Sequence, residues 1–396
     1  MTELIIALLA TVAIQALTSV TVFTAAILAP IAHQDIGVAA NAIGVFTSIV
    51  YGVASISAPI GGAFVARAGA VRVSQACLVF AGCGLAVCGL VHPLIVVLGA
   101  ALIGIGYGPP APAGSTLLIE HTPDRLRNLI MSIRQTGVPV GGAFAGVVVP
   151  SLVIGVGWRV TALVMAGLCV LLALVLQTMR AAYDRPTRQA AAPRPPLTSL
   201  ARMVWTHEEL RRLSFASFAY AGMQVCFTSY LVVFLTENGG LSVLNAGAAL
   251  SAAMVAGIVG RISWGLVADI FGNARTLLAL LGVTMALCAA SMVFVTAAWP
   301  FSLVLLLCVV FGAIAMGWNG VFVAEIARIA PDGKVAIATG ASLAVTYFGV
   351  MIGPFFFWLI LKATGSYPAA FGSAAIVTLA AAALIMRRIP AAAASV

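Results

Sequence analysis

Charge is scarce in this chain. Only 8% of its 396 residues are charged, whereas 62% are hydrophobic. A soluble domain averages about 25% charged residues, so this sequence cannot cover a water-facing surface, although it can cover a lipid-facing one. The scarcity of charge argues against a soluble enzyme and predicts an all-α polytopic membrane protein.

Groups that carry enzymatic or metal chemistry are also few. The four histidines, the seven cysteines and the eleven carboxylates form no cluster with metal-ligand spacing. No phosphate-cradling Gly-Lys-Thr loop is present, which excludes an ATP-driven motor. The cysteines all fall within apolar segments and predict no disulfide framework. We therefore expect no cofactor and no metal.

Twelve apolar runs, each long enough to span a bilayer, follow one another along the chain. They lie at about 4–29, 42–64, 74–91, 94–118, 129–154, 159–179, 213–235, 244–265, 276–297, 300–324, 335–361 and 368–386. Lipid offers no partner to backbone polar groups, so runs of this length without strict alternation predict transmembrane helices. An even number of spans places both termini on the same side.

Basic residues predict the orientation. Sixteen of the twenty Lys and Arg lie on one side of the predicted spans, and only Arg159 and Lys362 lie on the other. Cytoplasmic loops carry an excess of basic residues, so we expect both termini in the cytoplasm of a bacterium, with the protein in its inner membrane. The net charge of +9 is thus a topology signal and predicts no nucleic-acid partner.

The longest loop divides the chain into two parts of similar length. Between Arg180 and Arg212 the sequence is rich in proline and arginine, which predicts an extended or disordered linker. We expect an N-terminal six-helix bundle at 1–180, a cytoplasmic linker loop at 181–212 and a C-terminal six-helix bundle at 213–396.

An internal repeat supports this division, because a motif after the second predicted helix recurs 203 residues later, after the eighth. The first copy is Gly62, Ala66, Gly69 and Arg72, with Arg67 beside it, and the second copy is Gly265, Asp269, Gly272 and Arg275.

With this motif in both halves of a twelve-helix chain, the sequence resembles the major facilitator superfamily over nearly its whole length. The resemblance implies a secondary transporter that works by alternating access, with its substrate between the halves. It also implies that the motif latches the cytoplasmic side. The first copy has Ala66 where the superfamily has an Asp, so we expect a lopsided latch that depends on Asp269. We expect a monomer.

A glycine-rich segment on the fifth predicted helix leaves an alternative open. Gly137-Val138-Pro139-Val140-Gly141-Gly142 loosely resembles the Gly-Pro motif of superfamily antiporters, which implies an efflux pump for drugs or amphipathic metabolites. Small residues also let helices approach closely, so packing explains the segment equally well.

Two arginines inside the spans are the strongest candidates for substrate binding, because ionisable residues within the membrane are costly and rare. Arg134 lies roughly 10 Å, and Arg261 at most roughly 12 Å, from the cytoplasmic ends of their helices. Two cations with no acid beside them predict a small organic anion, whose carboxylate the guanidinium fork fits bidentately. Alternatively, Arg261 pairs with Asp269, and Arg134 pairs with Glu120 or Glu325.

The segment from Arg261 to Ala268 (Arg-Ile-Ser-Trp-Gly-Leu-Val-Ala) is similar to the helix-8 segment of monocarboxylate transporters. That resemblance implies that Arg261 binds a substrate carboxylate. The chain has Gly257 where the monocarboxylate pattern has an Asp, so a proton relay at Arg261 is not implied.

Polar and aromatic residues at mid-helix are further candidates for substrate binding: Gln15, Gln224, Tyr107, Trp318 and Asn319. Membrane-embedded amides can also join helices. We expect three other tyrosines of the predicted spans, Tyr220, Tyr230 and Tyr347, to pack within the bundle.

Energy coupling is expected from the charge of the substrate. Uptake of an anion works against the membrane potential by about 2.3 kcal/mol per charge per 100 mV, so it requires a co-transported proton or an exchanged anion. Glu325 is the acid that we expect as a proton site. A receptor that binds its ligand without moving it is the alternative from another functional class.

Overall fold

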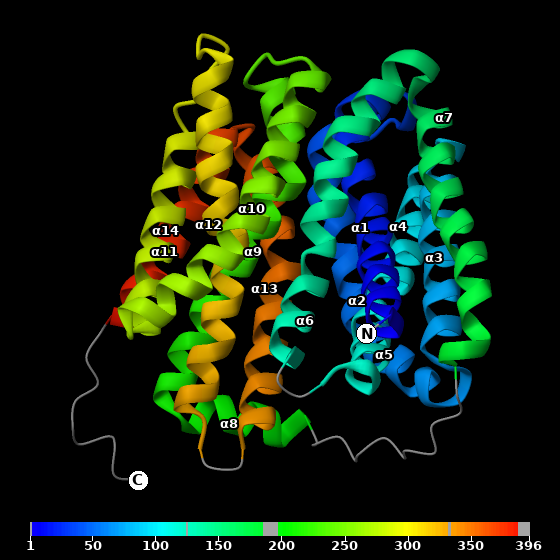
Figure 1. Cartoon of the computed structure of the whole chain (residues 1–396). Helices are drawn as coiled ribbons and strands as arrows, with labels where there is room; N and C mark the ends of the chain where they lie inside the picture. The colour runs from blue at the N-terminus through cyan, green and yellow to red at the C-terminus, as the bar shows by residue number, and fades with distance from the viewer. Residues whose placement is uncertain (1, 124–125, 185–196, 332–333, 387–396) are drawn as a thin grey trace.

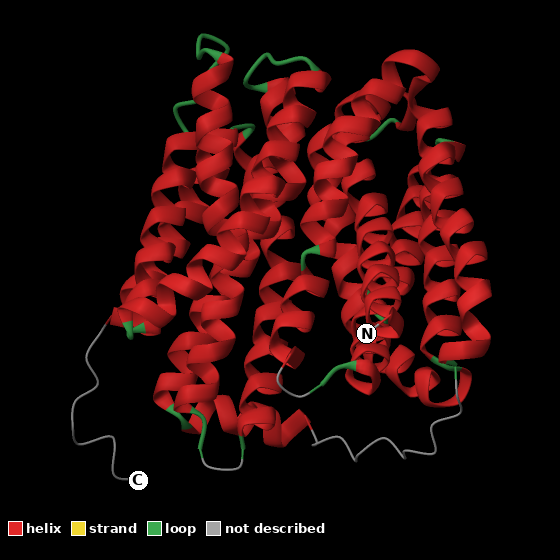
Figure 2. Cartoon of the chain, in the orientation of Figure 1, coloured by secondary structure: helices red, strands yellow, loops and turns green. Residues whose placement is uncertain are grey.

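The chain folds into helices throughout the residues that the computed structural model describes, which are 2–123, 126–184, 197–331 and 334–386. In this part of the chain no residue lies in a strand (Figure 2). Because lipid supplies no hydrogen-bond partner, an apolar chain satisfies its backbone groups within helices. The fold class predicted from the sequence is confirmed.

The described helices follow in chain order. The first half contains α1 (Thr2–Ile36), a 3-10 turn at Ala40–Ala42, α2 (Ile43–Ala68), α3 (Ala70–Val87), a 3-10 turn at Cys88–Leu90, α4 (Pro93–Tyr107), α5 (Pro110–His121), α6 (Arg127–Gln135) and α7 (Gly137–Tyr183). The rest contains α8 (Leu197–Thr206), α9 (Glu208–Glu237), α10 (Val243–Phe271), α11 (Ala274–Met292), α12 (Phe301–Ile329), α13 (Val335–Thr364) and α14 (Tyr367–Met386).

Twelve membrane crossings are present. Eleven helical stretches of the described residues are long and apolar enough to span a bilayer, and one of them, Ile130–Tyr183, has 54 residues. That length corresponds to about 80 Å of helix, against a hydrocarbon core of about 30 Å. Gly157 breaks the stretch with a φ of 78° and a ψ of 164°, so the chain turns there and crosses a second time.

Two of the predicted helices are interrupted, which the sequence analysis did not anticipate. The run at 94–118 divides into α4 and α5, because Pro109 and Pro110 lack the N–H that would continue α4. The run at 129–154 divides at Thr136, between α6 and α7. The prediction of one unbroken helix in each run was therefore wrong.

The predicted linker also contains a helix. An extended loop was expected from 181 to 212, but α8 forms over Leu197–Thr206 and packs against α9 and α13. Val204 of α8 is buried, whereas Trp205 is 61% exposed. An amphipathic segment of this kind folds where it can bury its apolar side, and this segment does so against the second half.

The helices form two bundles (Figure 1). In the first, α1 and α3 pack against α7, and α2 packs against α4; in the second, α10 packs against α12, α9 against α13, and α11 against α14. The boundaries of the bundles at 1–180 and 213–396 remain predictions. Helix pairs α7–α10, α2–α13 and α1–α9 join the two bundles, and these contacts frame the candidate site.

The contact between α7 and α10 is close at the end of the molecule opposite α8. A Cβ built on Gly146 would lie 2.6 Å from the carbonyl oxygen of Gly247, and a Cβ on Gly247 would lie 2.4 Å from that of Gly146. Neither position has room for a larger residue, so the two backbones touch. The halves are thus in direct contact at this end.

Candidate functional site

The break between α6 and α7 places Arg134 inside the first half. Its side chain is only 6% exposed, and its Nη1 donates to the carbonyl oxygen of Ala111 on α5 at 3.0 Å. Gly114 leaves the room for it, because a Cβ there would lie 3.1 Å from Arg134 Nη1. The Nε of Arg134 is buried without a hydrogen-bond partner among the described residues.

Arg261 reaches the same place from the second half. Its Nη1 donates to the carbonyl oxygen of Gln135 at 3.3 Å and to the side-chain Oε1 of Gln135 at 3.4 Å. Its Nε, like that of Arg134, is buried and has no partner within the described chain. Since Gln135 directly follows Arg134, the two arginines converge on the C-terminal end of α6 from opposite halves.

The structure bears on the alternative in which these arginines pair with acids. Glu325 pairs with Arg328 instead of Arg134, with Nη2–Oε1 and Nε–Oε2 distances of 2.6 and 2.7 Å. The side chains of Glu120 and Asp269 lie outside the described part of the structure. Among the described ion pairs, none includes Arg134 or Arg261. The alternative expectation that Arg134 pairs with Glu325 was therefore wrong.

Two tyrosines interact electrostatically with the arginines, and a third packs against one of them. Tyr107 on α4 neighbours Arg261, and its ring centroid lies 5.3 Å from that of Tyr51 on α2, edge to face. Tyr347 on α13 is the corresponding neighbour of Arg134. The site thus combines two cations with phenol hydroxyls, which can donate hydrogen bonds to an anion.

Of these three tyrosines, only Tyr107 was predicted from the sequence to bind substrate. Tyr347 was expected to pack, yet it is 53% exposed, whereas Tyr220 and Tyr230 are buried as expected. Tyr51 was not considered, because it is an aromatic residue in an apolar run. No signal within one sequence separates a tyrosine that lines a site from one that fills a core.

The remaining polar candidates divide between two places. Gln15 is 8% exposed and lies against Gly137, close to the end of α6. Gln224 accepts hydrogen bonds from Trp318 Nε1 at 3.1 Å and from Asn319 Nδ2 at 3.3 Å. Among the described hydrogen bonds of Gln224, Trp318 and Asn319, none reaches Arg134 or Arg261. Gln15 therefore lies beside the end of α6 that carries Arg134, whereas Trp318 and Asn319 are both hydrogen-bonded to Gln224.

The second copy of the motif lies at one end of the C-terminal bundle. Arg275 donates from Nε to the carbonyl oxygen of Ile385 at 2.8 Å and from Nη1 to Glu209 at 3.1 Å, so it joins α9, α11 and α14. Gly272 ends α10 with a positive φ of 62°, and Gly265 has open space around it. Glu325 lines a small pocket together with Glu209 and Arg275.

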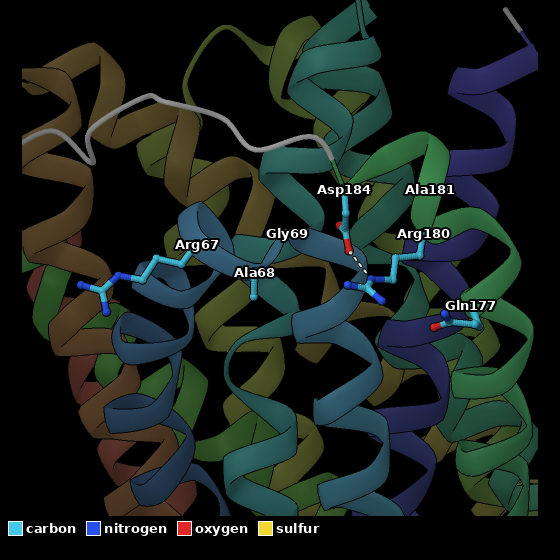
Figure 3. Close-up of a pocket in the computed structure, with 7 residues that line it drawn as sticks. All are labelled: Arg67, Ala68, Gly69, Gln177, Arg180, Ala181 and Asp184. Carbon is cyan, nitrogen blue, oxygen red and sulfur yellow. Dashed lines mark ion pairs between the residues drawn. The ribbon is translucent and has the colours of Figure 1, made fainter.

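The first copy of the motif holds a carboxylate that sequence reasoning missed. Asp184, just after α7, accepts hydrogen bonds from the backbone N–H of Val71 at 2.8 Å and of Arg72 at 3.0 Å, at the N-terminus of α3. Arg180 Nε lies 3.9 Å from its Oδ2 (Figure 3). A carboxylate other than Asp269 therefore lies at a helix N-terminus beside the motif, and the lopsided latch that depends on Asp269 stays a prediction.

The surroundings of Asp184 form an open pocket at this end of the molecule. Arg67, Gly69, Gln177 and Arg180 line it together with Asp184 (Figure 3). Two other residues of the motif lie nearby. Arg72 is exposed, and Gly62 lies in the last two turns of α2, five residues before Arg67. The function of both motif copies as latches remains a prediction.

The antiporter-like glycines serve helix packing. A Cβ on Gly141 would lie 2.3 Å from the carbonyl oxygen of Ala16 on α1, and a Cβ on Gly142 would lie 2.9 Å from Met254 on α10. Both glycines therefore allow close helix approach. The packing interpretation accounts for them without an exporter role.

Comparisons with known proteins bear on this arrangement. The 4-hydroxybenzoate transporter PcaK of Acinetobacter baylyi is 32% identical over 133 residues, which are 33% of this chain and 29% of that protein. The probable sulfoacetate transporter SauU of Cupriavidus necator is 26% identical over 373 residues, which are 87% of this chain and 84% of that protein.

A solved structure shares the fold. The crystal structure of a bacterial homolog of the human lysosomal transporter Spinster matches with a TM-score of 0.74 at 16% identity, covering 97% of this chain and 95% of that one. The family model described as Major Facilitator Superfamily matches residues 9–327. With its twelve crossings and this match, the chain belongs to the major facilitator superfamily.

Proposed function

We propose that this protein is a secondary active transporter that carries a small organic anion, with a carboxylate as the favoured group, across the cytoplasmic membrane by alternating access. The observation that carries the proposal is the convergence of Arg134 and Arg261 from opposite halves, each with a buried Nε that lacks a partner among the described residues. Unpaired cations within a membrane are costly. A bound carboxylate offers both the missing charge and the missing acceptors.

The names of the two relatives support an anion, since 4-hydroxybenzoate and sulfoacetate both carry a carboxylate. Tyr107, Tyr51 and Tyr347 would add phenol hydroxyls around the anion, and Gln15 would border it. An outer layer of residues around the anion would contain Gln224, Trp318 and Asn319. Both termini would lie in the cytoplasm, as the distribution of basic residues predicts.

The negative charge of the substrate also requires that its transport be coupled to another ion. Accumulation of an anion against a negative-inside potential costs about 2.3 kcal/mol per charge per 100 mV. The transporter therefore needs a proton or a counter-anion, and Glu325 is our candidate proton site. Because Glu325 pairs bidentately with Arg328, protonation of Glu325 would have to break this ion pair.

Flux into proteoliposomes tests the proposal. Purified protein should accumulate labelled 4-hydroxybenzoate or sulfoacetate, and Arg134→Ala and Arg261→Ala should each lower uptake about 10- to 100-fold, which corresponds to the loss of one charge-assisted hydrogen bond. Arg159→Ala is the matched control, because Arg159 is exposed and pairs with Asp35 away from the site. It should leave uptake unchanged.

Three other outcomes separate the alternatives. Uptake that survives both arginine changes would sink the anion site. Stabilisation by the anion without accumulation would identify a receptor. Accumulation of cationic drugs, but of neither anion, in inside-out vesicles would identify an efflux pump.

A further inference from the structure

One residue holds Arg261 across the two halves. Gln135 presents two oxygens to the same guanidinium nitrogen, its backbone carbonyl at 3.3 Å and its side-chain Oε1 at 3.4 Å. Both distances are at the long end for N–H···O bonds. The Gln135 side chain is itself exposed, so it can leave Arg261 without disturbing a packed core.

The sequence explains why the carbonyl of Gln135 is free to accept. Gln135 is the last residue of α6, and the donor four residues onward in a continuous helix would be Pro139, which has no N–H. Carbonyls at a helix C-terminus also carry partial negative charge. The end of α6 therefore offers neutral, partly negative acceptors at the place where a substrate anion would offer charged ones.

We propose that Gln135 occupies Arg261 in the unliganded protein and that a substrate carboxylate displaces it, so that only a ligand that binds Arg261 more strongly than Gln135 does enters the site. This inference rests on the function proposed above. Hydrogen bonds to an ionised acceptor are roughly twice as strong as bonds between neutral groups. A neutral ligand gains nothing over the oxygens already present and loses its freedom of motion on binding, whereas a carboxylate gains the difference.

Displacement also changes how the halves are connected. Gln135 belongs to the first half and Arg261 to the second, so their bond links the halves directly. When a carboxylate takes the place of Gln135, the link runs through the substrate and to the free Nε groups of Arg134 and Arg261. The residue that a ligand must displace is thus the same residue that joins the halves in the absence of substrate.

Two substitutions at Gln135 test this role by thermal-shift titration with 4-hydroxybenzoate, with sulfoacetate and with neutral 4-hydroxybenzamide. Gln135→Glu supplies an internal carboxylate to Arg261 and should weaken binding of both anions at least about tenfold. Gln135→Ala removes the side-chain competitor and leaves the backbone carbonyl in place, so binding of 4-hydroxybenzoate and of its amide should stay equal or tighten by the same factor. Gln34→Glu, which adds the same charge at an exposed position near the end of α1, should titrate like wild type.

A double substitution separates displacement from misfolding. In ligand-free protein Gln135→Glu should raise the midpoint of thermal unfolding, because it forms an ion pair with Arg261, and this rise should vanish in the Arg261→Ala background.

The results that overturn the inference differ from those that overturn the proposed function. If Gln135→Glu leaves anion binding unchanged, Gln135 does not compete with the substrate for Arg261, and the anion site itself stands. A loss of affinity in Gln135→Ala equal to that in Gln135→Glu shows that Gln135 binds the substrate itself, which also overturns displacement. Failure of both anions to stabilise even the wild-type protein overturns the proposed function and the inference together.

Discussion

Asp184 lies so close to Gly69 that a Cβ built on Gly69 would be 2.2 Å from the Asp184 carboxyl carbon. Gly69 has a φ of +91°, which a residue with a side chain rarely adopts. Both the conformation and the contact thus require glycine here. Gly272, at the equivalent place in the second half, has a φ of +62° but open space around it.

This difference predicts unequal responses to the same substitution. Gly69→Ala should destabilise the protein by about 1 kcal/mol through the backbone and by more through the clash, and it should displace Asp184 from α3. Gly272→Ala should show only the backbone cost. Thermal unfolding of the two purified variants measures the difference, and equal midpoints would contradict the packing argument.

Removal of the Asp184 charge tests the latch in the first half. The Asp184 side chain is 6% exposed and accepts one backbone N–H with each oxygen, so Asp184→Asn, which keeps one oxygen, should cost about 0.5–1.5 kcal/mol, the net contribution of one hydrogen bond. Transport should slow, because α3 loses its tie to the end of α7. Asp35→Asn, at an exposed ion pair, is the control. Unchanged transport in Asp184→Asn would restore Asp269 as the sole latch carboxylate.

The contact between Gly146 and Gly247 predicts a steric block. Gly146→Val should keep α7 and α10 apart and hold open the end of the molecule opposite α8, so transport should fall more than about tenfold. Gly167→Val, at a position on α7 with open space, should transport normally. Ser251 on α10 lies in the same contact, since a Cβ built on Gly146 would be 3.1 Å from the Cβ of Ser251. A cysteine introduced at this position should therefore react with an impermeant maleimide in Gly146→Val and be protected otherwise.

Glu325 remains our candidate for proton coupling. Glu325→Gln should abolish the response of uptake to an imposed pH gradient, while exchange of labelled for unlabelled anion continues. The measurement is uptake by proteoliposomes with and without the gradient. A gradient response as large as that of the wild-type protein would assign coupling to another group or to anion exchange.

The sequence was sufficient for the crossings but not for the details of the site. Hydropathy predicts spans because lipid imposes the same requirement on every residue of a run. The breaks at Thr136 and Pro109 leave the hydropathy of their runs unchanged, and the hydrogen bond that Asp184 accepts from Val71 joins residues 113 positions apart. A charge that is rare in a membrane, such as Arg134 or Arg261, stands out in one sequence; a contact between distant common residues does not.

Helix α7 gives these observations a mechanical meaning. Its 47 residues begin beside Gln135 and end beside Asp184, and Gly157 is the residue within it whose dihedral angles are not helical. The candidate substrate site and the carboxylate that caps α3 therefore lie at the two ends of one helical hairpin, which turns at Gly157. A tilt of the first half of α7, driven by the exchange of Gln135 for an anion at Arg261, would be passed to the second half through the turn at Gly157.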